Sequence, residues 1–301
     1  MFVKFQLITL PLFASVVLVG SAQDENGTSR VTQTAGGPER IDLSHFPGQM
    51  VDKVVVPIPA EIFSVLDKVG EPNWAGGIQM PGDDEKIRDR DILALRFGGL
   101  VAEGFIAVQA KSSDDIQKIG RRVLSLAESL GLADAVRPHS QSIIESAGKR
   151  DWGKVREELD GTQQTVRSTM EKLRDDELSG LVSLGGWLRG TNVLTEFISE
   201  FFSEDKAELL NQPGLVSHFR KMMTELKEPV RDSPRMKSLA TGLARLEAVL
   251  NQSPTISEES VNQLNLITRD MLEEFYFKKG QEESARAGED GAKAPARETE
   301  N

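Results

Sequence analysis

The sequence contains no cysteine, which excludes disulfide bonds, thiol catalysis and thiolate metal sites. Its stability must therefore come from an ordinary packed core. Aromatic residues are scarce, at 6% of the chain, and histidine occurs only three times. Acidic residues outnumber basic ones and give a formal net charge of -11. Because nucleic acid is also negatively charged, this net charge makes binding to it through bulk electrostatics unfavourable.

Signatures of the common catalytic sites are also missing. The chain has no G-x-S-x-G nucleophile elbow, no H-E-x-x-H zinc motif and no glycine-rich phosphate loop after a strand. The three histidines, His45, His139 and His218, show no metal-ligand spacing. A metal site built from His139, His218 and a carboxylate remains an alternative. We predict no cofactor, and the sequence favours a protein without catalytic activity.

The N-terminus has the pattern of a secretory signal peptide. An apolar run over residues 5–19 follows a single charge, Lys4. Small residues at Gly20 and Ala22 predict cleavage after Ala22. An uncleaved membrane anchor is the alternative, but the run is shorter than the ~20 residues of a spanning helix and contains Pro11. We expect an exported protein, periplasmic or secreted, with no transmembrane helix in the mature chain.

Composition divides the remaining chain into three parts. Residues 23–49 are rich in small and polar side chains and predict a flexible linker. Residues 50–279 hold nearly all the large apolar side chains and predict a single helical domain. Residues 280–301 are charged and almost free of large apolar side chains, which predicts a disordered tail. Within the domain, 51–58 is β-branched, and its prolines favour an extended segment laid on the helices over an edge strand.

Two apolar, glycine-bearing stretches stand out in the domain, 92–111 and 177–202. Both are long enough for helices and apolar or small around most of their circumference, as expected of helices central to a bundle. Glycine destabilises a helix, so its density indicates close approach of backbones, a bend or room for a ligand. Close approach is the simplest of these explanations, and Gly186-x-x-x-Gly190 has the spacing of tight helix pairs.

Helical periodicity dominates from residue 83 onward. The sequence therefore predicts an all-α protein, an irregular bundle of about eight helices around the two glycine-rich central helices, with a short extended N-terminal segment. Trp74 lies in a loop punctuated by proline and glycine, where we expect it to act as a hydrophobic plug. Stacking of Trp74 on a ligand is the alternative.

Polar residues follow one stripe on each central helix. Arg96 and Glu103 are seven residues apart on the first, while Arg189, Asn192 and Glu196 follow at spacings of three and four on the second. If the helices are neighbours, Arg96 with Glu196, or Arg189 with Glu103, would form an internal network or line a polar pocket. Alternatively, each stripe is the solvent edge of its helix. These five residues are the candidate ligand-binding residues.

The sequence supports two functional readings. The first is an exported, non-catalytic helical protein with a binding or structural role in a bacterial cell envelope, where a cysteine-free exported chain fits well. Its partner, a protein or a small molecule, is not identified by any motif. The alternative is an enzyme or metal-dependent ligand binder that uses the Arg/Glu cluster between the two central helices.

Overall fold

The computed structural model describes residues 49–51, 54–56, 59–82, 87–173 and 175–277, and all of them belong to one unit that begins at Arg40. This part of the chain contains nine helices of 11 residues or more, which confirms the predicted all-α bundle. The predicted signal peptide, nearly all of the linker and the charged tail lie outside the described residues. The helices are α1 (Pro59–Val69), α2 (Arg90–Gln109), α3 (Ser113–Leu130), α4 (Ala133–Gly148), α5 (Trp152–Leu173), α6 (Asp176–Glu200), the short α7 (Glu204–Ala207), α8 (Pro213–Glu225), α9 (Pro234–Leu250) and α10 (Glu258–Glu273).

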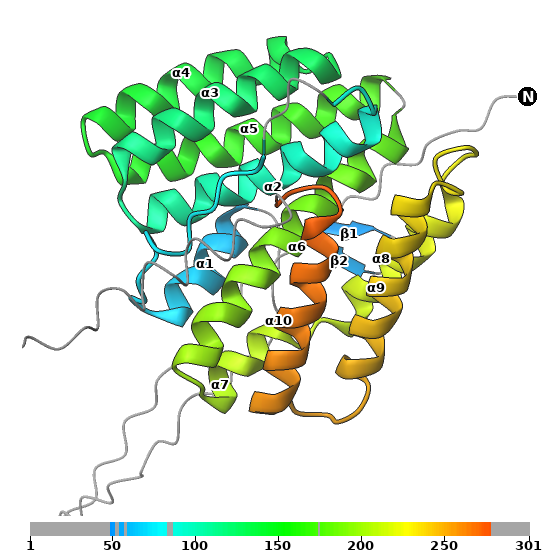
Figure 1. Ribbon diagram of the computed structural model, residues 1–301. Coiled ribbons are helices and arrows are strands. Elements are labelled where there is room, and N and C mark those ends of the chain that lie inside the picture. The colour runs from blue at the N-terminus through cyan, green and yellow to red at the C-terminus, as the bar shows by residue number, and fades with distance from the viewer. Residues whose placement is uncertain (1–48, 52–53, 57–58, 83–86, 174, 278–301) are drawn as a thin grey trace, which may run out of the picture. The chain divides into compact units, whose positions relative to one another are not determined.

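The extended N-terminal segment forms a small hairpin rather than a single unpaired stretch. β1 (Gln49–Val51) and β2 (Val54–Val56) pair antiparallel, with Val51 opposite Val54. β2 lies against α8 (Figure 1). The prolines do not prevent this pairing because both follow β2, and Pro59 is the first residue of α1, a position where its missing N–H costs nothing.

The first central helix begins later than the helical periodicity from residue 83 suggests. α2 begins at Arg90, not at residue 83, and the residues described between α1 and α2 are irregular. Elsewhere the predicted boundaries agree closely with the structure. Asp175 caps α6 by accepting a bond from the Leu178 N–H at 3.1 Å, and Ser233 caps α9 through the Met236 N–H at 3.3 Å.

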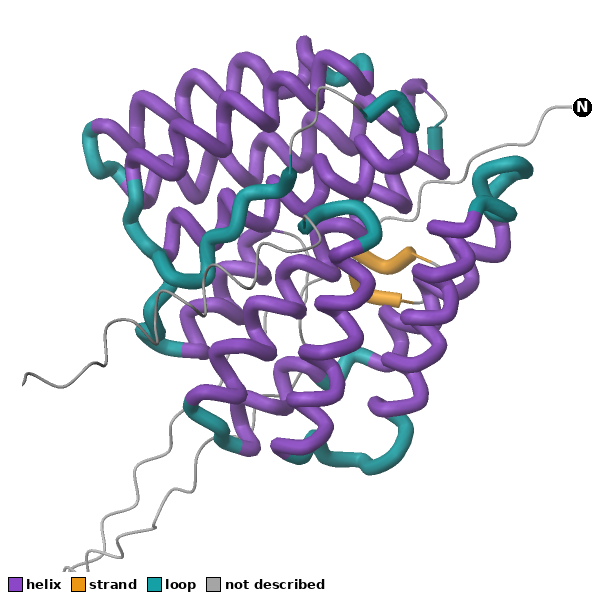
Figure 2. Tube along the Cα trace, viewed as in Figure 1, coloured by secondary structure: helices purple, strands orange, loops and turns teal. Residues whose placement is uncertain are grey.

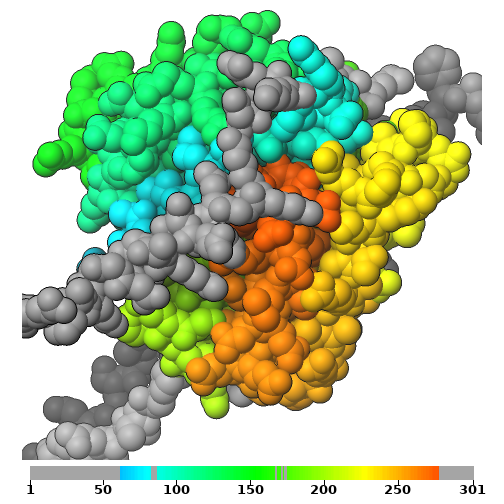
Figure 3. Space-filling view, viewed as in Figure 1, coloured from blue at the N-terminus to red at the C-terminus, as the bar shows by residue number. Residues whose placement is uncertain are grey.

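α2 and α6 pack against each other in the middle of the described unit. α3 packs on α2, α4 on α3 and α5 on α4, while α10 packs on α6 and is followed by α9 and then α8. Figures 1 and 2 show these two groups of helices on opposite sides of the central pair. On the face shown in Figure 3, α10 (orange) lies beside α9.

Two glycines allow the central helices to touch backbone to backbone. A Cβ atom on Gly98 of α2 would lie 1.9 Å from the carbonyl oxygen of Val182 in α6. A Cβ atom on Gly185 of α6 would lie 2.0 Å from the carbonyl oxygen of Leu95 in α2. Real Cβ atoms do not come so close to a carbonyl oxygen, so this packing requires glycine at both positions. Close approach of backbones is thus the reason for these two glycines.

The small-residue pair singled out in the sequence has a different role from the one expected. Gly186 lies against Gly98, since its Cβ would be 3.2 Å from the Gly98 carbonyl oxygen. At Gly190, however, no described atom lies within 4 Å of an added Cβ. The motif Gly186-x-x-x-Gly190 therefore does not form the helix contact, which instead uses Gly185 and Gly186 at one level of the helix.

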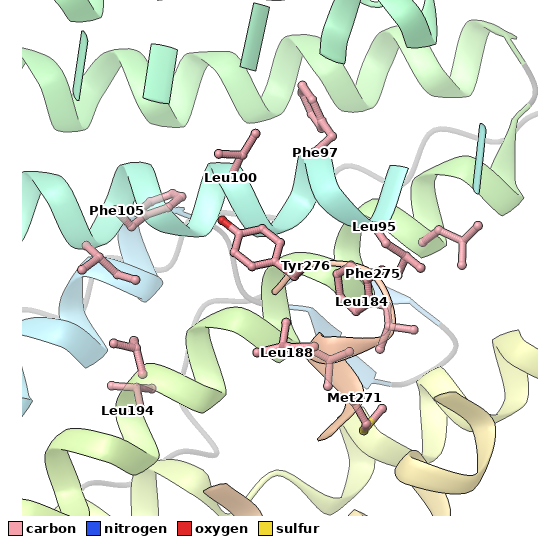
Figure 4. Close-up of a cluster of buried hydrophobic side chains, with 14 of the residues drawn as sticks. Leu95, Phe97, Leu100, Phe105, Leu184, Leu188, Leu194, Met271, Phe275 and Tyr276 are labelled. Carbon is pink, nitrogen blue, oxygen red and sulfur yellow. The ribbon is translucent and has the colours of Figure 1, made fainter. Parts of the chain in front are cut away.

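Around this crossing lies an apolar core that includes an aromatic side chain from the turn after α10. Leu95 and Leu100 of α2 and Leu184 and Leu188 of α6 are fully buried. Tyr276 is also fully buried, and Figure 4 shows it between the two helices. Gly99 makes room for it, because a Cβ there would be 2.4 Å from the Tyr276 ring.

Candidate functional site

A buried ion pair joins the two central helices. The Nε of Arg189 on α6 donates to Oε1 of Glu103 on α2, and both side chains are fully buried. The neighbouring glycine contact brings the helices close enough for these side chains to meet. Removing two charges from water is costly unless each finds a charged partner and further hydrogen bonds. The remaining polar atoms of the pair therefore decide what this cluster does.

The loop at residues 70–82 supplies several of those bonds. The Nη2 of Arg189 donates to the Gly77 carbonyl oxygen. Oε2 of Glu103 accepts from the backbone N–H of Gln79 at 3.2 Å. Oε1 of Glu103 also accepts from the Tyr276 hydroxyl at 3.4 Å. The ion pair thus satisfies backbone groups of an irregular, partly buried loop that has no helical ladder of its own.

A second branch connects the pair to α10. The Nη1 of Arg189 donates to Asn192 Oδ1 at 3.3 Å, and Asn192 Nδ2 donates to Thr268 Oγ1 at 3.4 Å. Thr268 in turn donates to the Leu264 carbonyl oxygen at 2.8 Å. Asn192 and Thr268 are fully buried. The network therefore links α2, α6, α10 and the 70–82 loop through groups that are hydrogen-bonded to one another.

The electrostatics of the pair follow from burial and proximity. Burial raises the pKa of Glu103, while Arg189, the Gln79 N–H and the Tyr276 hydroxyl oppose that rise. Burial by itself would lower the pKa of Arg189, but Glu103, Tyr276 and Glu196 together outweigh it, so the net shift is upward and the guanidinium stays protonated. Burial, followed by the charge of Glu103, raises the pKa of Tyr276 well above its usual value, so its hydroxyl remains a donor.

Arg96 lies in a separate polar cluster at the end of the same loop. Its Nε donates to the Phe275 carbonyl oxygen at 2.5 Å and its Nη1 to the Gly82 carbonyl oxygen at 3.0 Å. Arg122 of α3 donates to the Pro81 and Gly82 carbonyl oxygens at 2.8 and 2.6 Å. The Gly82 N–H donates to the Tyr276 carbonyl oxygen at 3.1 Å. These bonds hold the 70–82 loop and the turn after α10 together against α2 and α3.

Replacing Arg96 with methionine tests this role. The Arg96→Met variant keeps much of the side-chain volume but leaves two carbonyl oxygens without these donors, at a cost of about 1–3 kcal/mol. We expect hydrogen exchange at the Gly82 amide to become roughly ten- to a hundredfold faster, measured by NMR or mass spectrometry. Arg245→Met, at an exposed ion pair with Asp270, is the matched control and leaves this amide unchanged. Equal exchange in both variants would contradict the role.

The structure brings together three of the five candidate residues and separates the other two. Arg189, Glu103 and Asn192 meet in the network, in agreement with one of the two pairings that the sequence suggested. Arg96 donates instead to backbone carbonyl oxygens. Glu196 is partly buried; desolvation raises its pKa, opposed by Arg189 and Arg269. The polar stripes are therefore not simple solvent edges, while their predicted ligand-binding role remains a prediction.

Sequence reasoning missed the partners from outside the two helices. No spacing in the sequence connects Tyr276 or Thr268 to Glu103 and Arg189. None connects Arg122 to the cluster around Arg96. The carbonyl and amide groups of the 70–82 loop cannot be recognised in a sequence at all, because every residue has them. A loop placed between two central helices must have its backbone groups satisfied, and this was the available signal.

Trp74 and the three histidines were the other candidates, for ligand stacking and for metal binding. Trp74 is buried, packs edge-on against Phe197 with ring centroids 4.9 Å apart, and donates its indole N–H to the Gly70 carbonyl oxygen, as a plug does. His139 lies on α4 and His218 on α8 beside Phe219, while His45 is outside the described residues. Over the described ranges, no group of three His, Cys, Asp or Glu side chains is placed to hold a metal ion.

Two surface hollows border the described helices. One, of about 360 Å³, has Arg96 in its wall together with Arg88, Arg235, Asp89, Glu274 and Phe275. The other, of about 670 Å³, lies between α8 and α9 over Met223 and Met236. Its four basic side chains, Arg220, Lys221, Arg231 and Lys237, each contact a carboxylate of this chain. Arg189 and Glu103 line neither of these hollows.

No family model, curated protein or solved structure matches this chain. Among the helices that the structure describes, none combines the length and apolar character needed to cross a membrane. Because no known protein matches, the role of the buried polar cluster has to be inferred from its own geometry. The donors and acceptors of this cluster bond to one another and to backbone groups. Such an arrangement stabilises a fold.

Proposed function

We propose that this chain is an exported, non-catalytic helical protein with a binding or structural role in a bacterial cell envelope. The observation that carries the non-catalytic part is the use of Arg189, Glu103 and Asn192 in internal hydrogen bonds. A catalytic group must reach a reacting atom of a substrate. The full burial of these side chains removes them from that role.

Export is supported by the N-terminal sequence alone. A lysine, an apolar run and small residues at Gly20 and Ala22 form the pattern that a signal peptidase recognises. The absence of cysteine and the acidic, soluble composition are compatible with a folded protein of the periplasm or the outside medium. The partner is a protein or small molecule that contacts the exterior of the bundle.

Expression of the full chain in a Gram-negative host tests export. We expect the protein in the periplasmic fraction or the medium, with an intact mass that begins at Gln23. The control is Ala22→Glu, which places a charged side chain next to the cleavage position, so the chain retains its leader and stays with the membrane. A full-length protein in the cytosol in both cases would contradict the proposal.

A second candidate function is suggested by the smaller hollow. Three arginines and two carboxylates border it, so it has the charge and size for a small anionic ligand. Mass spectrometry of the mature protein, purified from its native envelope extract without denaturation, separates the two candidates. Recovery of a protein partner supports the first, recovery of a stoichiometric small anion that is lost in Arg235→Ala supports the second, and a catalysed change in any recovered ligand contradicts both.

A further inference from the structure

A second polar cluster lies between α4 and α5, away from the central helices. His139 and Ser142 belong to α4, and Glu158 and Thr165 belong to α5. The ring of His139 places Nδ1 3.0 Å from Glu158 Oε2 and Nε2 3.0 Å from Thr165 Oγ1. Ser142 donates to the other carboxylate oxygen of Glu158 at 2.9 Å. One histidine thus bridges a carboxylate and a hydroxyl on the neighbouring helix.

The hydrogen bonds of this cluster fit a protonated ring best. The Thr165 hydroxyl donates its only proton to the Gly161 carbonyl oxygen at 2.9 Å, so towards His139 it can only accept. An ionised Glu158 also only accepts. Both ring nitrogens must then donate, and only the protonated imidazolium does so. A neutral ring gives up one of these bonds or makes Thr165 turn away from Gly161.

The same hydrogen bonds do not fit a catalytic role for the cluster. Carboxylate, imidazole and hydroxyl occur in the order of a hydrolytic triad. In a triad, however, the hydroxyl gives its proton to the imidazole, whereas the Thr165 proton bonds to the backbone of its own helix. The arrangement therefore fits a proton-dependent contact between helices better than a nucleophile.

Gly161 provides the space in which the ring lies. A Cβ atom at this position would be 3.1 Å from Cε1 and 3.5 Å from Nδ1 of His139. Glycine inside a helix costs about 1 kcal/mol relative to alanine. This cost is explained if the close approach of the ring to α5 is needed. The glycine and the acceptor Thr165, one helical turn later, together form the surroundings of the imidazole.

Few charges face this ring. Glu158 contacts it directly, and Lys154 of α5 lies behind that carboxylate, 3.3 Å from Oε1. Two other charged side chains of α4 form pairs elsewhere: Arg137 with Glu128 of α3, and Glu145 with Lys149. On its other side, α4 packs on α3, where Gly120 faces Ile144 and Ser140. The net field at the ring is therefore set mainly by Glu158 and by the lysine that partly offsets it.

We propose that His139 and Glu158 form a proton-dependent latch that strengthens the contact between α4 and α5 in mildly acidic solution. The bond from His139, followed by those from Ser142 and Lys154, lowers the pKa of Glu158 against the opposing effect of burial. The carboxylate contribution is therefore present above the usual pKa of 4.5 and is lost as the pH falls through the lowered value. The latch is therefore closed in mildly acidic solution while Glu158 is ionised and the ring carries its proton, and it weakens towards alkaline pH, where the ring gives up one of its two bonds.

The test compares unfolding by urea at pH 5.5 and pH 8.0 in wild-type protein and His139→Gln. We expect the substitution to raise the unfolding equilibrium constant about three- to tenfold more at pH 5.5 than at pH 8.0, the range for a partly exposed charge pair. In a Glu158→Gln background this pH-dependent difference disappears. His218→Gln, on α8, is the matched histidine control and leaves the difference intact.

Equal effects of His139→Gln at both pH values, or a pH-dependent effect that persists without Glu158, would overturn the latch. If His139→Gln fails to fold, the comparison moves to hydrogen exchange in wild-type protein and Glu158→Gln. After correction for intrinsic rates, amides of α4 and α5 are then more protected at pH 5.5 than at pH 8.0 in wild type only. Identical pH profiles in the two proteins would likewise overturn the proposal.

Discussion

Gly98→Ala and Gly185→Ala are each expected to destabilise the protein by about 3 kcal/mol or more, measured by urea unfolding with circular dichroism. A single methyl group has this effect because its position is within 2.0 Å of a backbone carbonyl oxygen in the facing helix. A side chain would rotate away, but a carbonyl oxygen moves only with its helix. Such a loss is a large share of the roughly 5–15 kcal/mol of a typical domain.

Gly190→Ala is the matched control on the same helix. No described atom lies within 4 Å of its added Cβ, so only helix propensity changes, and we expect the protein to become about 0.5–1 kcal/mol more stable. The double variant with alanine at 98 and 185 should cost less than the sum of the single variants, since one displacement relieves both clashes. A Gly98→Ala variant as stable as Gly190→Ala would contradict backbone contact between α2 and α6.

The ion pair predicts the second large effect. Glu103→Gln leaves the buried Arg189 charge without its carboxylate, and we expect a loss of about 3–5 kcal/mol in the free energy of unfolding. Replacing both residues together, as Glu103→Leu with Arg189→Met, should cost less than Glu103→Gln alone, because no charge is then left buried and unpaired. A double variant that is less stable than both Glu103→Gln and Arg189→Met would contradict this account.

Arg189→Met should differ from Glu103→Gln in its dependence on pH. Burial raises the pKa of Glu103 above its usual value of 4.5, and without Arg189 nothing as strong opposes that rise. A folded state that binds a proton more readily than the unfolded state becomes less stable as the pH rises. We therefore expect Arg189→Met to lose stability from pH 5 to pH 8 relative to wild type, while Glu103→Gln shows no such slope from this site. Parallel slopes would contradict burial of the carboxylate.

Local pattern was sufficient for most of the fold. The periodicity of apolar residues located the long helices, and the two stretches that were small and apolar all round proved to be the central pair. The caps Asp175 and Ser233 each bond to a backbone N–H only three residues away, so helix starts of this kind depend on local sequence. Helical periodicity was predicted from residue 83, whereas α2 begins at Arg90 and the preceding Gly82 belongs to a loop held by Arg96 and Arg122.

The polar cluster was predictable only in part. Buried charges need opposite partners, so two pairings followed once the helices were assumed to be neighbours, Arg96 with Glu196 or Arg189 with Glu103, and the structure shows the second. Which glycine faces which carbonyl group depends on the crossing geometry, and for this reason the sequence pointed to Gly186 with Gly190 instead of Gly185 with Gly186. The backbone groups of Gly77 and Gln79 have no sequence signature, so the structural role of the cluster becomes visible only in three dimensions.

The most direct test is an isotope-edited nuclear Overhauser measurement on protein labelled only at glycine. A Cβ on Gly186 would lie 3.9 Å from the Gly98 Cα, so the α-protons of these two glycines are within range of a cross-peak. The account predicts that cross-peak in the wild-type protein and its loss in Gly98→Ala, with the Gly190 signals unchanged. Assigned spectra without a contact between Gly98 and Gly186 would show that the central helices do not meet at their backbones.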